Sequence, residues 1–356
     1  MQIAIRADSS KIIGTGHIMR CMTLAHALKN EGYFVTFYSR AHEGNLNNWL
    51  ANQGMDVRII PAGSNSIDQY STAHGSWLGA TQAEDIQATL NIINTVPDLW
   101  IVDHYGLDHV WHKAMATRSQ VMVIDDLADR RYDACLLLDQ NLGRKESDYA
   151  QLTNAKILAG VDYTLLRPEF IEQRQKASIR QGIKNIVISM GGVDLQNVSG
   201  IAFRTLLNSH LHELESITVV LGHANPHRAD MQLLASQATH IQVEVVQGVS
   251  NMAEYFARAD LCIGAAGATS WERCAVGLPT VLVQLAANQQ IAAQQLTKVG
   301  AALSLDIGQL ESHLEPVVKE LANNSDKLMG MSRLAFSLID AEGTTRVVKE
   351  IKSLFA

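Results

Sequence analysis

The sequence predicts an α/β protein made of two doubly wound, Rossmann-like domains. Short runs of Val, Ile and Leu that end in polar residues alternate with helical patterns along almost the whole chain, which is typical of parallel strands buried on both faces. The length of 356 residues suits two domains of ordinary size. The alternation pauses once, at Arg167-Pro168 and a charged helical segment that runs to Arg180, and then starts again. We therefore expect two doubly wound domains, with the carboxyl ends of both sheets gathered at the cleft between them, where ligands bind in open α/β folds.

The individual elements follow from the same patterns. Strands of the first series are expected at residues 3–7, 34–39, 57–60, 99–103, 121–125, 134–138 and 156–158, with helices at 18–30, 81–96 and 109–118. Strands of the second series are expected at residues 185–190, 217–221, 241–246, 261–265 and 280–284, and the chain reads as helical from about residue 309. These elements predict an N-terminal domain at 1–168 and a C-terminal domain at 182–356, with the last helix free to pack back on the first domain.

Composition excludes several classes of protein. The net charge of -7 and an aromatic content of 6% argue against a nucleic-acid partner, which needs a basic face and stacking rings. The chain shows neither a signal peptide nor an apolar run of membrane-spanning length, so we expect a cytoplasmic protein that is not inserted in a membrane. Four scattered cysteines form no C-x-x-C pair, and we interpret them as buried thiols, Cys274 included.

A histidine flanked by glycines follows the first predicted strand. Gly14 and Gly16 permit a tight turn and a close approach of ligand to backbone, and the helix N-terminus behind them favours an anion. His17 lies in the first turn of that helix, and its side chain titrates near neutral pH. We interpret His17 as a catalytic imidazole. The alternative, a surface or capping histidine, stays open.

The second domain carries two further loops of small residues. Gly191 and Gly192 follow a strand and precede a helix that begins near Asn197. Later, the segment 264–273 leaves a strand and enters a helix, where a phosphate would meet backbone N–H groups and the hydroxyls of Thr269 and Ser270. The predicted nucleotide site consists of Gly191, Gly192, Val249, Met252, Gly267, Thr269, Ser270 and Glu272, the last as an acceptor for ribose hydroxyls. Tight packing is the alternative explanation of the glycines.

Standard nucleotide and metal signatures are missing from the sequence. It contains no G-x-x-x-x-G-K-[ST] loop, and the first turn has Met19 where the dinucleotide pattern needs its third glycine. No Asp-x-Asp pair ends a strand, and the histidines at 104, 109 and 112 lack partner carboxylates at ligand spacing. We therefore expect no metal site and no cofactor.

Six segments together resemble the nucleotide-sugar hydrolases of pseudaminic acid biosynthesis, which act on UDP-2,4-diacetamido-2,4,6-trideoxy-β-L-altropyranose. The similar segments are 5–21, 102–108, 124–130, 165–170, 190–194 and 266–274. The likeness spans roughly residues 3 to 290, and it implies a two-domain glycosyltransferase-B-like fold similar to the MurG-type transferases. The implied reaction is attack of water on the anomeric carbon, which releases UDP with inversion and produces a precursor of bacterial surface glycans.

The resemblance also implies roles for individual residues. It makes His17 the general base, and it implies that UDP leaves without metal assistance, with the UDP-sugar and water as small-molecule partners and protein partners left open. Asp8 and Asp103 end neighbouring strands and are candidates to orient His17 or the sugar, with capping as the alternative. Tyr105, Asn288 and Gln289 are expected to contact the sugar or the water. A glycosyltransferase that uses a UDP-sugar donor is the competing function, followed by a nucleotide-sugar-binding regulator.

Overall fold

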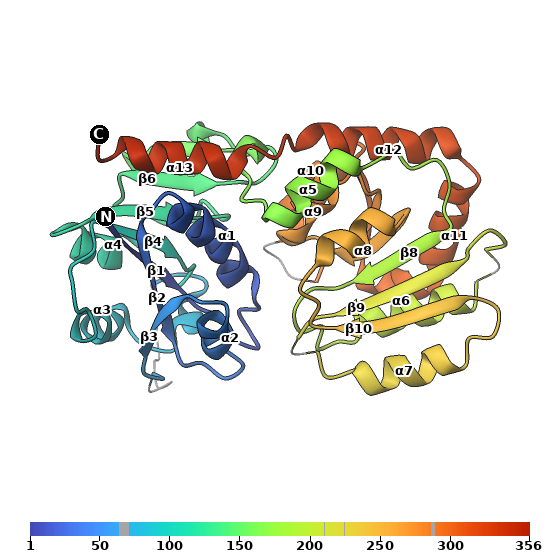
Figure 1. The fold of residues 1–356 in the computed structure, drawn as a ribbon, viewed down its shortest axis with the longest axis horizontal. Helices are drawn as coiled ribbons and strands as arrows, with labels where there is room; N and C mark the ends of the chain where they lie inside the picture. Colours follow the sequence, from blue (N-terminus) through green and yellow to red (C-terminus); the bar gives the residue numbers. More distant parts are fainter. Residues whose placement is uncertain (64–70, 210, 224, 286–288) are drawn as a thin grey trace. The chain divides into compact units, whose positions relative to one another are not determined.

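The computed structural model describes residues 1–63, 71–209, 211–223, 225–285 and 289–356. The chain divides into two compact units, the first formed by Met1–Leu165 with Glu342–Ala356 and the second by Leu166–Ala341. In each unit a parallel sheet has helices on both faces (Figure 1). The predicted α/β class with two parallel sheets is therefore confirmed.

The first unit contains a sheet of seven strands among the described residues, in the order β3-β2-β1-β4-β5-β6-β7. Its strands are β1 (Gln2–Ala7), β2 (Phe34–Arg40), β3 (Asp56–Ile60), β4 (Leu99–Asp103), β5 (Gln120–Ile124), β6 (Leu136–Asp139) and β7 (Lys156–Ala159). Ala7 of β1 is in register with Asp103 of β4, so the residues that follow these two strands lie side by side at the carboxyl edge.

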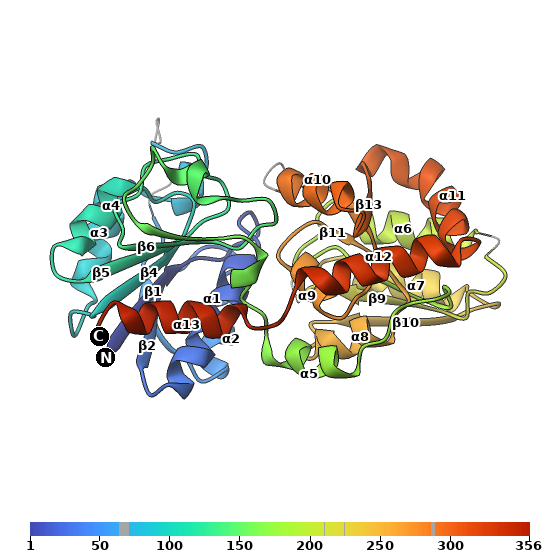
Figure 2. The ribbon, with the colours of Figure 1, turned by 90° about the horizontal axis from the view of Figure 1, so that it is seen from above.

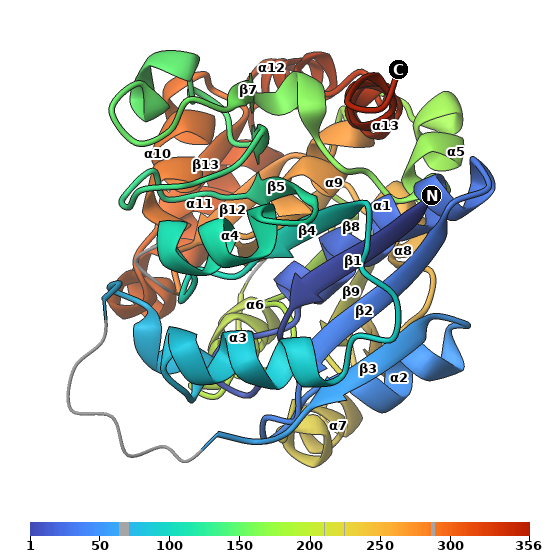
Figure 3. The same cartoon turned by 90° about the vertical axis from the view of Figure 1, so that its left-hand side faces the viewer.

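Helices cover both faces of this sheet. They are α1 (Gly16–Asn30), α2 (Asn47–Asn52), α3 (Gln82–Asn91), α4 (His109–Ala116) and α13 (Gly343–Ser353), with short 3-10 turns at Gly75–Leu78, Glu146–Tyr149 and Val161–Tyr163. One core packs α1 and α13 against alternate strand residues, and a second core lies under α3 and α4 (Figure 3). The domain boundaries expected from the sequence place the last helix in the second domain and leave it free to pack on the first. In the structure α13 belongs to the first unit, because Val347, Val348 and Ile351 enter the core beside α1 (Figure 2).

The second unit repeats the pattern, and six strands are found in its described part, in the order β10-β9-β8-β11-β12-β13. The strands are β8 (Asn185–Ser189), β9 (Ser216–Leu221), β10 (Gln242–Gln247), β11 (Leu261–Ala265), β12 (Thr280–Val283) and β13 (Ala302–Leu305). The helices are α5 (Pro168–Lys176), α6 (Val198–Leu207), α7 (Arg228–Ser236), α8 (Met252–Arg258), α9 (Thr269–Ala275), α10 (Gln290–Lys298), α11 (Leu310–Ala322) and α12 (Ser325–Leu338), with a 3-10 turn at Ile307–Gln309. Side chains of α6, α7 and α11 form the core against one face of this sheet.

Two elements differ from the expectation. Strand β13 was not predicted, because its four residues form only a short run after Gly300. Helix α3 ends at Asn91 instead of residue 96, six residues before Pro97, which cannot continue a helix. Among the described residues, no helix is both long and apolar enough to cross a membrane.

Candidate functional site

The imidazole of His17 is held by a carboxylate at the end of β4. Nδ1 of His17 lies 2.6 Å from Oδ1 of Asp103, and both side chains are buried. An ionised carboxylate only accepts hydrogen bonds, so Nδ1 carries the proton and donates it. Nε2 of the neutral ring then carries a lone pair, and no hydrogen bond engages this atom within the described part of the chain. The pair has the geometry of a general base with its orienting carboxylate.

Arg20 completes the surroundings of Asp103. It lies three residues after His17 on α1, and it donates from Nε and NH2 to the two carboxylate oxygens at 2.6 and 2.7 Å. Burial alone would raise the pKa of Asp103, but Arg20 and His17 hold the pKa well below its usual range. Asp103 is therefore an anion at neutral pH. Of the two aspartates that the sequence offered as partners of His17, the structure brings Asp103 to it.

Asp8 takes part in a different network. Its carboxylate is fully buried and accepts hydrogen bonds from Arg6 at 2.5 and 2.9 Å and from the backbone N–H of Arg40 at 2.7 Å. Nε2 of His104 lies 3.2 Å away. Burial opposes ionisation, yet Arg6 and the neighbouring histidines hold the pKa of Asp8 well below its usual range. The oxygens of Asp8 are thus bound inside the unit, whereas Asp103 is the carboxylate at His17, and a contact of Asp8 with the sugar stays a prediction.

Aromatic rings surround His17. The ring of Tyr105 packs edge-on at 4.5 Å between centroids, and Trp77 lies 6.2 Å away. His74 in turn contacts both Trp77 and Tyr105. Tyr105 is only 3% exposed and its hydroxyl donates to Asp126, so it shapes the surroundings of the base, and its contact with the sugar or the water stays a prediction. Trp77, which is partly exposed, was missed because the segment around it has no periodic pattern.

The two glycines before His17 behave differently. Gly14 has φ of +80°, a left-handed conformation that favours glycine, and its N–H closes the turn on the carbonyl of Ser10 at 2.9 Å. Gly16 begins α1, and a Cβ at this position would meet open space. The tight turn predicted from the sequence thus depends on Gly14.

The loops after β8 and β9 pack backbone against backbone. A Cβ on Gly222 would lie 2.1 Å from the carbonyl oxygen of Gly192, so glycine is required there. Gly191 is exposed and has φ of +87°. Asp194 closes the loop by accepting hydrogen bonds from the first N–H groups of α6, at 2.8 and 2.9 Å. Packing therefore accounts for Gly222, while Gly191 is exposed at the surface of the loop.

The turn between β11 and α9 is braced by a buried arginine. Arg273 donates to the carbonyl of Ala265 at 2.7 Å and to the hydroxyl of Ser270 at 2.9 Å. Ser270 is 1% exposed and its hydroxyl oxygen accepts from Arg273, so the structure gives it a partner inside the turn, and its role toward a phosphate stays a prediction. Gly267 and Thr269 remain partly exposed on the turn.

Glu272 forms an ion pair that the sequence analysis missed. Its two oxygens accept from Nε and NH2 of Arg167 at 2.7 and 3.2 Å. Glu169 contacts the same guanidinium at 2.9 Å. Glu272 is only partly buried, and each of its oxygens has a second lone pair for a ligand hydroxyl.

The remaining residues of the predicted nucleotide and sugar sites differ in how exposed their side chains are. Met252 is buried at the start of α8, whereas Val249 is partly exposed in the preceding loop. Gln289 is partly exposed, and its amide nitrogen would lie 3.9 Å from a Cβ built on Gly267, which puts it beside the predicted diphosphate turn. Asn288 lies outside the described residues.

The histidines that were considered as metal ligands, and the thiol of Cys274, have contacts that are typical of structural residues. In the described ranges no group of three His, Cys, Asp or Glu side chains could hold a metal ion. His109 is exposed, and His104 accepts a hydrogen bond from the N–H of Gly106 at 2.9 Å. Burial raises the pKa of the Cys274 thiol to about 12, so it is a neutral core residue at physiological pH.

His112 makes the stability of the first unit depend on pH. It is fully buried with no hydrogen bond to either ring nitrogen among the described residues. Burial, helped by Arg130, lowers its pKa to about 3, whereas an exposed imidazole titrates near 6.5. Between these values the unfolded chain binds a proton that the folded chain does not, so the free energy of unfolding falls as pH falls, by up to about 1.4 kcal/mol per unit.

The variant His112→Phe should lose this contribution. Urea unfolding of parent and variant between about pH 5 and pH 7 should give a smaller loss of stability for the variant on acidification. Carboxylates elsewhere contribute the same pH dependence to the stability of both proteins. Their contribution therefore cancels when the stability of the variant is subtracted from that of the parent. Equal losses of stability on acidification in parent and variant would contradict the lowered pKa of His112 as the cause.

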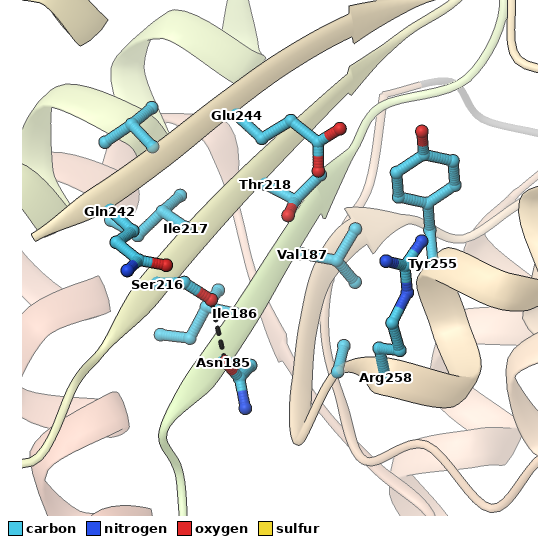
Figure 4. Close-up of a pocket in the computed structure, with 12 residues that line it drawn as sticks. Asn185, Ile186, Val187, Ser216, Ile217, Thr218, Gln242, Glu244, Tyr255 and Arg258 are labelled. Atoms are coloured by element: carbon cyan, nitrogen blue, oxygen red, sulfur yellow. Dashed lines mark hydrogen bonds between the residues drawn. The ribbon is translucent and has the colours of Figure 1, made fainter.

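A groove lies at the opposite end of the second sheet from the glycine loops. Its volume is about 320 Å³, and it covers the first residues of β8, β9 and β10 beside α8 (Figure 4). Glu244, Tyr255 and Arg258 contribute its larger polar side chains. None of the predicted site residues lines this groove, so it is separate from the site described above.

Comparisons with known proteins agree with this fold. Residues 202–349 match the glycosyltransferase family 28 C-terminal domain. The crystal structure of MurG from Acinetobacter baumannii superposes with a TM-score of 0.67 at 18% identity and covers 99% of both chains. The fold is that of the glycosyltransferase-B proteins.

Two relatives are similar along much of the sequence. The spore coat polysaccharide biosynthesis protein SpsG of Bacillus subtilis is 23% identical over 100% of this chain and 99% of its own length. The UDP-2,4-diacetamido-2,4,6-trideoxy-beta-L-altropyranose hydrolase of Campylobacter jejuni is 27% identical over 68% of this chain and 77% of its own length.

Proposed function

We propose that the protein hydrolyses a UDP-linked sugar to the free sugar and UDP, with inversion at the anomeric carbon. The observation that carries this proposal is the buried pair of His17 and Asp103, which directs an unbonded Nε2 away from the carboxylate. A general base of this kind contributes typically about 10²–10⁴-fold to a rate.

The proposed step conserves atoms and charge. Nε2 of His17 takes a proton from water while the water oxygen forms a bond to the anomeric carbon. The bond from that carbon to the β-phosphate oxygen breaks, and UDP leaves with the electron pair. Asp103 stabilises the imidazolium that forms, as the carboxylate of a catalytic triad does. UDP is a good leaving group, so backbone N–H donors suffice to stabilise its charge.

We assign the nucleotide to the second unit. Gly191 and the turn around Gly267 and Thr269 supply exposed backbone, and Glu272 supplies acceptors for the ribose hydroxyls. The match of residues 202–349 to a glycosyltransferase C-terminal domain supports this assignment.

The variant Glu272→Ala should weaken UDP binding by roughly 10- to 150-fold, since losing one partner of a charge-assisted hydrogen bond costs about 1.5–3 kcal/mol. Calorimetric titration of UDP measures this change. Glu169→Ala is the matched control, because it removes the other carboxylate from Arg167 and should leave affinity within about twofold. Unchanged affinity of Glu272→Ala would place the ribose elsewhere.

We propose UDP-2,4-diacetamido-2,4,6-trideoxy-β-L-altropyranose as the substrate, in pseudaminic acid biosynthesis in the cytoplasm. The name of the Campylobacter jejuni relative and the six similar segments support it. Transfer of a sugar from a UDP-sugar donor is the second candidate function, and the MurG-like fold favours it. Measuring UDP release with and without sugar acceptors distinguishes the two, because a hydrolase releases UDP in water alone.

A further inference from the structure

Arg20 links the proposed base to a second carboxylate. Besides its two bonds to Asp103, it donates from NH1 to Oδ2 of Asp126 at 2.6 Å. Asp126 also accepts from the hydroxyl of Tyr105 and from the amide of Asn141, the latter at 2.7 Å. The guanidinium is 6% exposed and uses three of its five N–H donors on two carboxylates, so its position is fixed on both sides.

The guanidinium also lies against the base itself. NH2 of Arg20 is 3.5 Å from Nδ1 of His17. Since Nδ1 already donates to Asp103, this approach places a positive charge beside the ring without a hydrogen bond to it. A nearby cation disfavours the imidazolium form, whereas the carboxylates favour it.

We propose that Arg20 is a positioning residue that clamps Asp103 against His17 and, together with Asp126, balances the charge that decides whether His17 is neutral. This inference rests on the proposed function, because its consequence is a base that is free to accept the proton of water. Asp103 and Asp126 contribute two negative charges and Arg20 one positive charge. Removing Arg20 leaves two uncompensated negative charges near His17. Removing the charge of Asp126 leaves Asp103 and Arg20, whose charges cancel.

Other polar groups facing His17 are few in the described part of the chain. The ring edges of Tyr105 and Trp77 contact it, and His74 lies behind both. Burial lowers the pKa of His74 and raises that of Tyr105, so both are neutral near pH 7. Arg130 lies over the far side of the Tyr105 ring at 5.7 Å. The charges that vary in the test are therefore those of Arg20 and Asp126.

The test follows the titration of the His17 ring by NMR, with the signal assigned by its loss in His17→Asn. Arg20→Met should raise the titration midpoint by about one pH unit or more, and Asp126→Asn should lower it by about half a unit. A merely structural role would not produce shifts of opposite sign. Arg118→Met, an exposed arginine on the same unit, is the control and should leave the midpoint unchanged. Shifts in the same direction, or none, would overturn the proposal.

A conservative variant keeps the test decisive if Arg20→Met fails to fold. Arg20→Lys retains the charge but loses the planar fork, so the midpoint should stay near that of the parent while kcat falls at least about tenfold at unchanged KM. An unchanged kcat would contradict the positioning role. If the parent releases no UDP from any UDP-sugar, the proposed function fails, whereas the NMR shifts still decide whether Arg20 and Asp126 balance the charge at His17.

Discussion

The variant His17→Asn should lose about 10²–10⁴-fold in the rate of UDP release while UDP affinity stays nearly unchanged. The asparagine amide can still donate to Asp103 from the position of Nδ1, which preserves the 2.6 Å contact, but it has no atom at the position of Nε2. The loss should therefore appear in kcat, because the nucleotide is assigned to the other unit. Steady-state kinetics and calorimetry with UDP measure the two effects separately.

An exposed histidine provides the control for this experiment. His109→Asn makes the same chemical change at the start of α4, where the side chain is about half exposed, and should leave turnover unaffected. Turnover of His17→Asn within about threefold of the parent would remove His17 from the mechanism, since even weak general-base catalysis exceeds that factor.

The variant Arg180→Met should destabilise the second unit by about 3–5 kcal/mol. Arg180 is 5% exposed, and its guanidinium donates to backbone carbonyls where α8 and α9 end. The accepting residues are Ser178, Phe256, Ala257, Ala259 and Val276. Methionine fills similar space but leaves these acceptors without their donor, and it removes a cation from helix C-termini.

Urea unfolding, with hydrogen exchange of the β8 to β13 amides to identify the unit, measures this loss. Arg204→Met changes an exposed arginine on α6 and should alter stability by no more than about 0.5 kcal/mol. A change of that size for Arg180→Met would show that water replaces the guanidinium at these carbonyls.

The sequence predicted the parallel sheets because their strands are short apolar runs buried on both faces, and it placed Asp8 and Asp103 together because neighbouring parallel strands end at one edge. It left the partner of His17 open, since the choice depends on side chains from distant segments. Arg6 binds Asp8 from within β1, whereas Arg20 binds Asp103 from α1.

Helical spacing in the sequence indicates two of the arginine contacts found in the structure. Arg20 lies three residues after His17, and Arg273 lies three residues after Ser270, so each pair shares a helix face. The first spacing predicts an arginine beside the base, and the second explains why the hydroxyl oxygen of Ser270 accepts a hydrogen bond from Arg273. No comparable signal marks Trp77, whose position follows from a 3-10 turn between irregular segments.

The most direct test of hydrolysis at the anomeric carbon is the position of oxygen-18 after turnover of the UDP-sugar in labelled water. We expect the label at C1 of the sugar, none in UDP, and an inverted anomer in the first product observed by NMR, all without an added acceptor. Label in the β-phosphate of UDP would show that the phosphorus–oxygen bond breaks, and turnover that requires an acceptor would show a transferase. Either result would contradict the account in which His17 activates water for attack on the anomeric carbon.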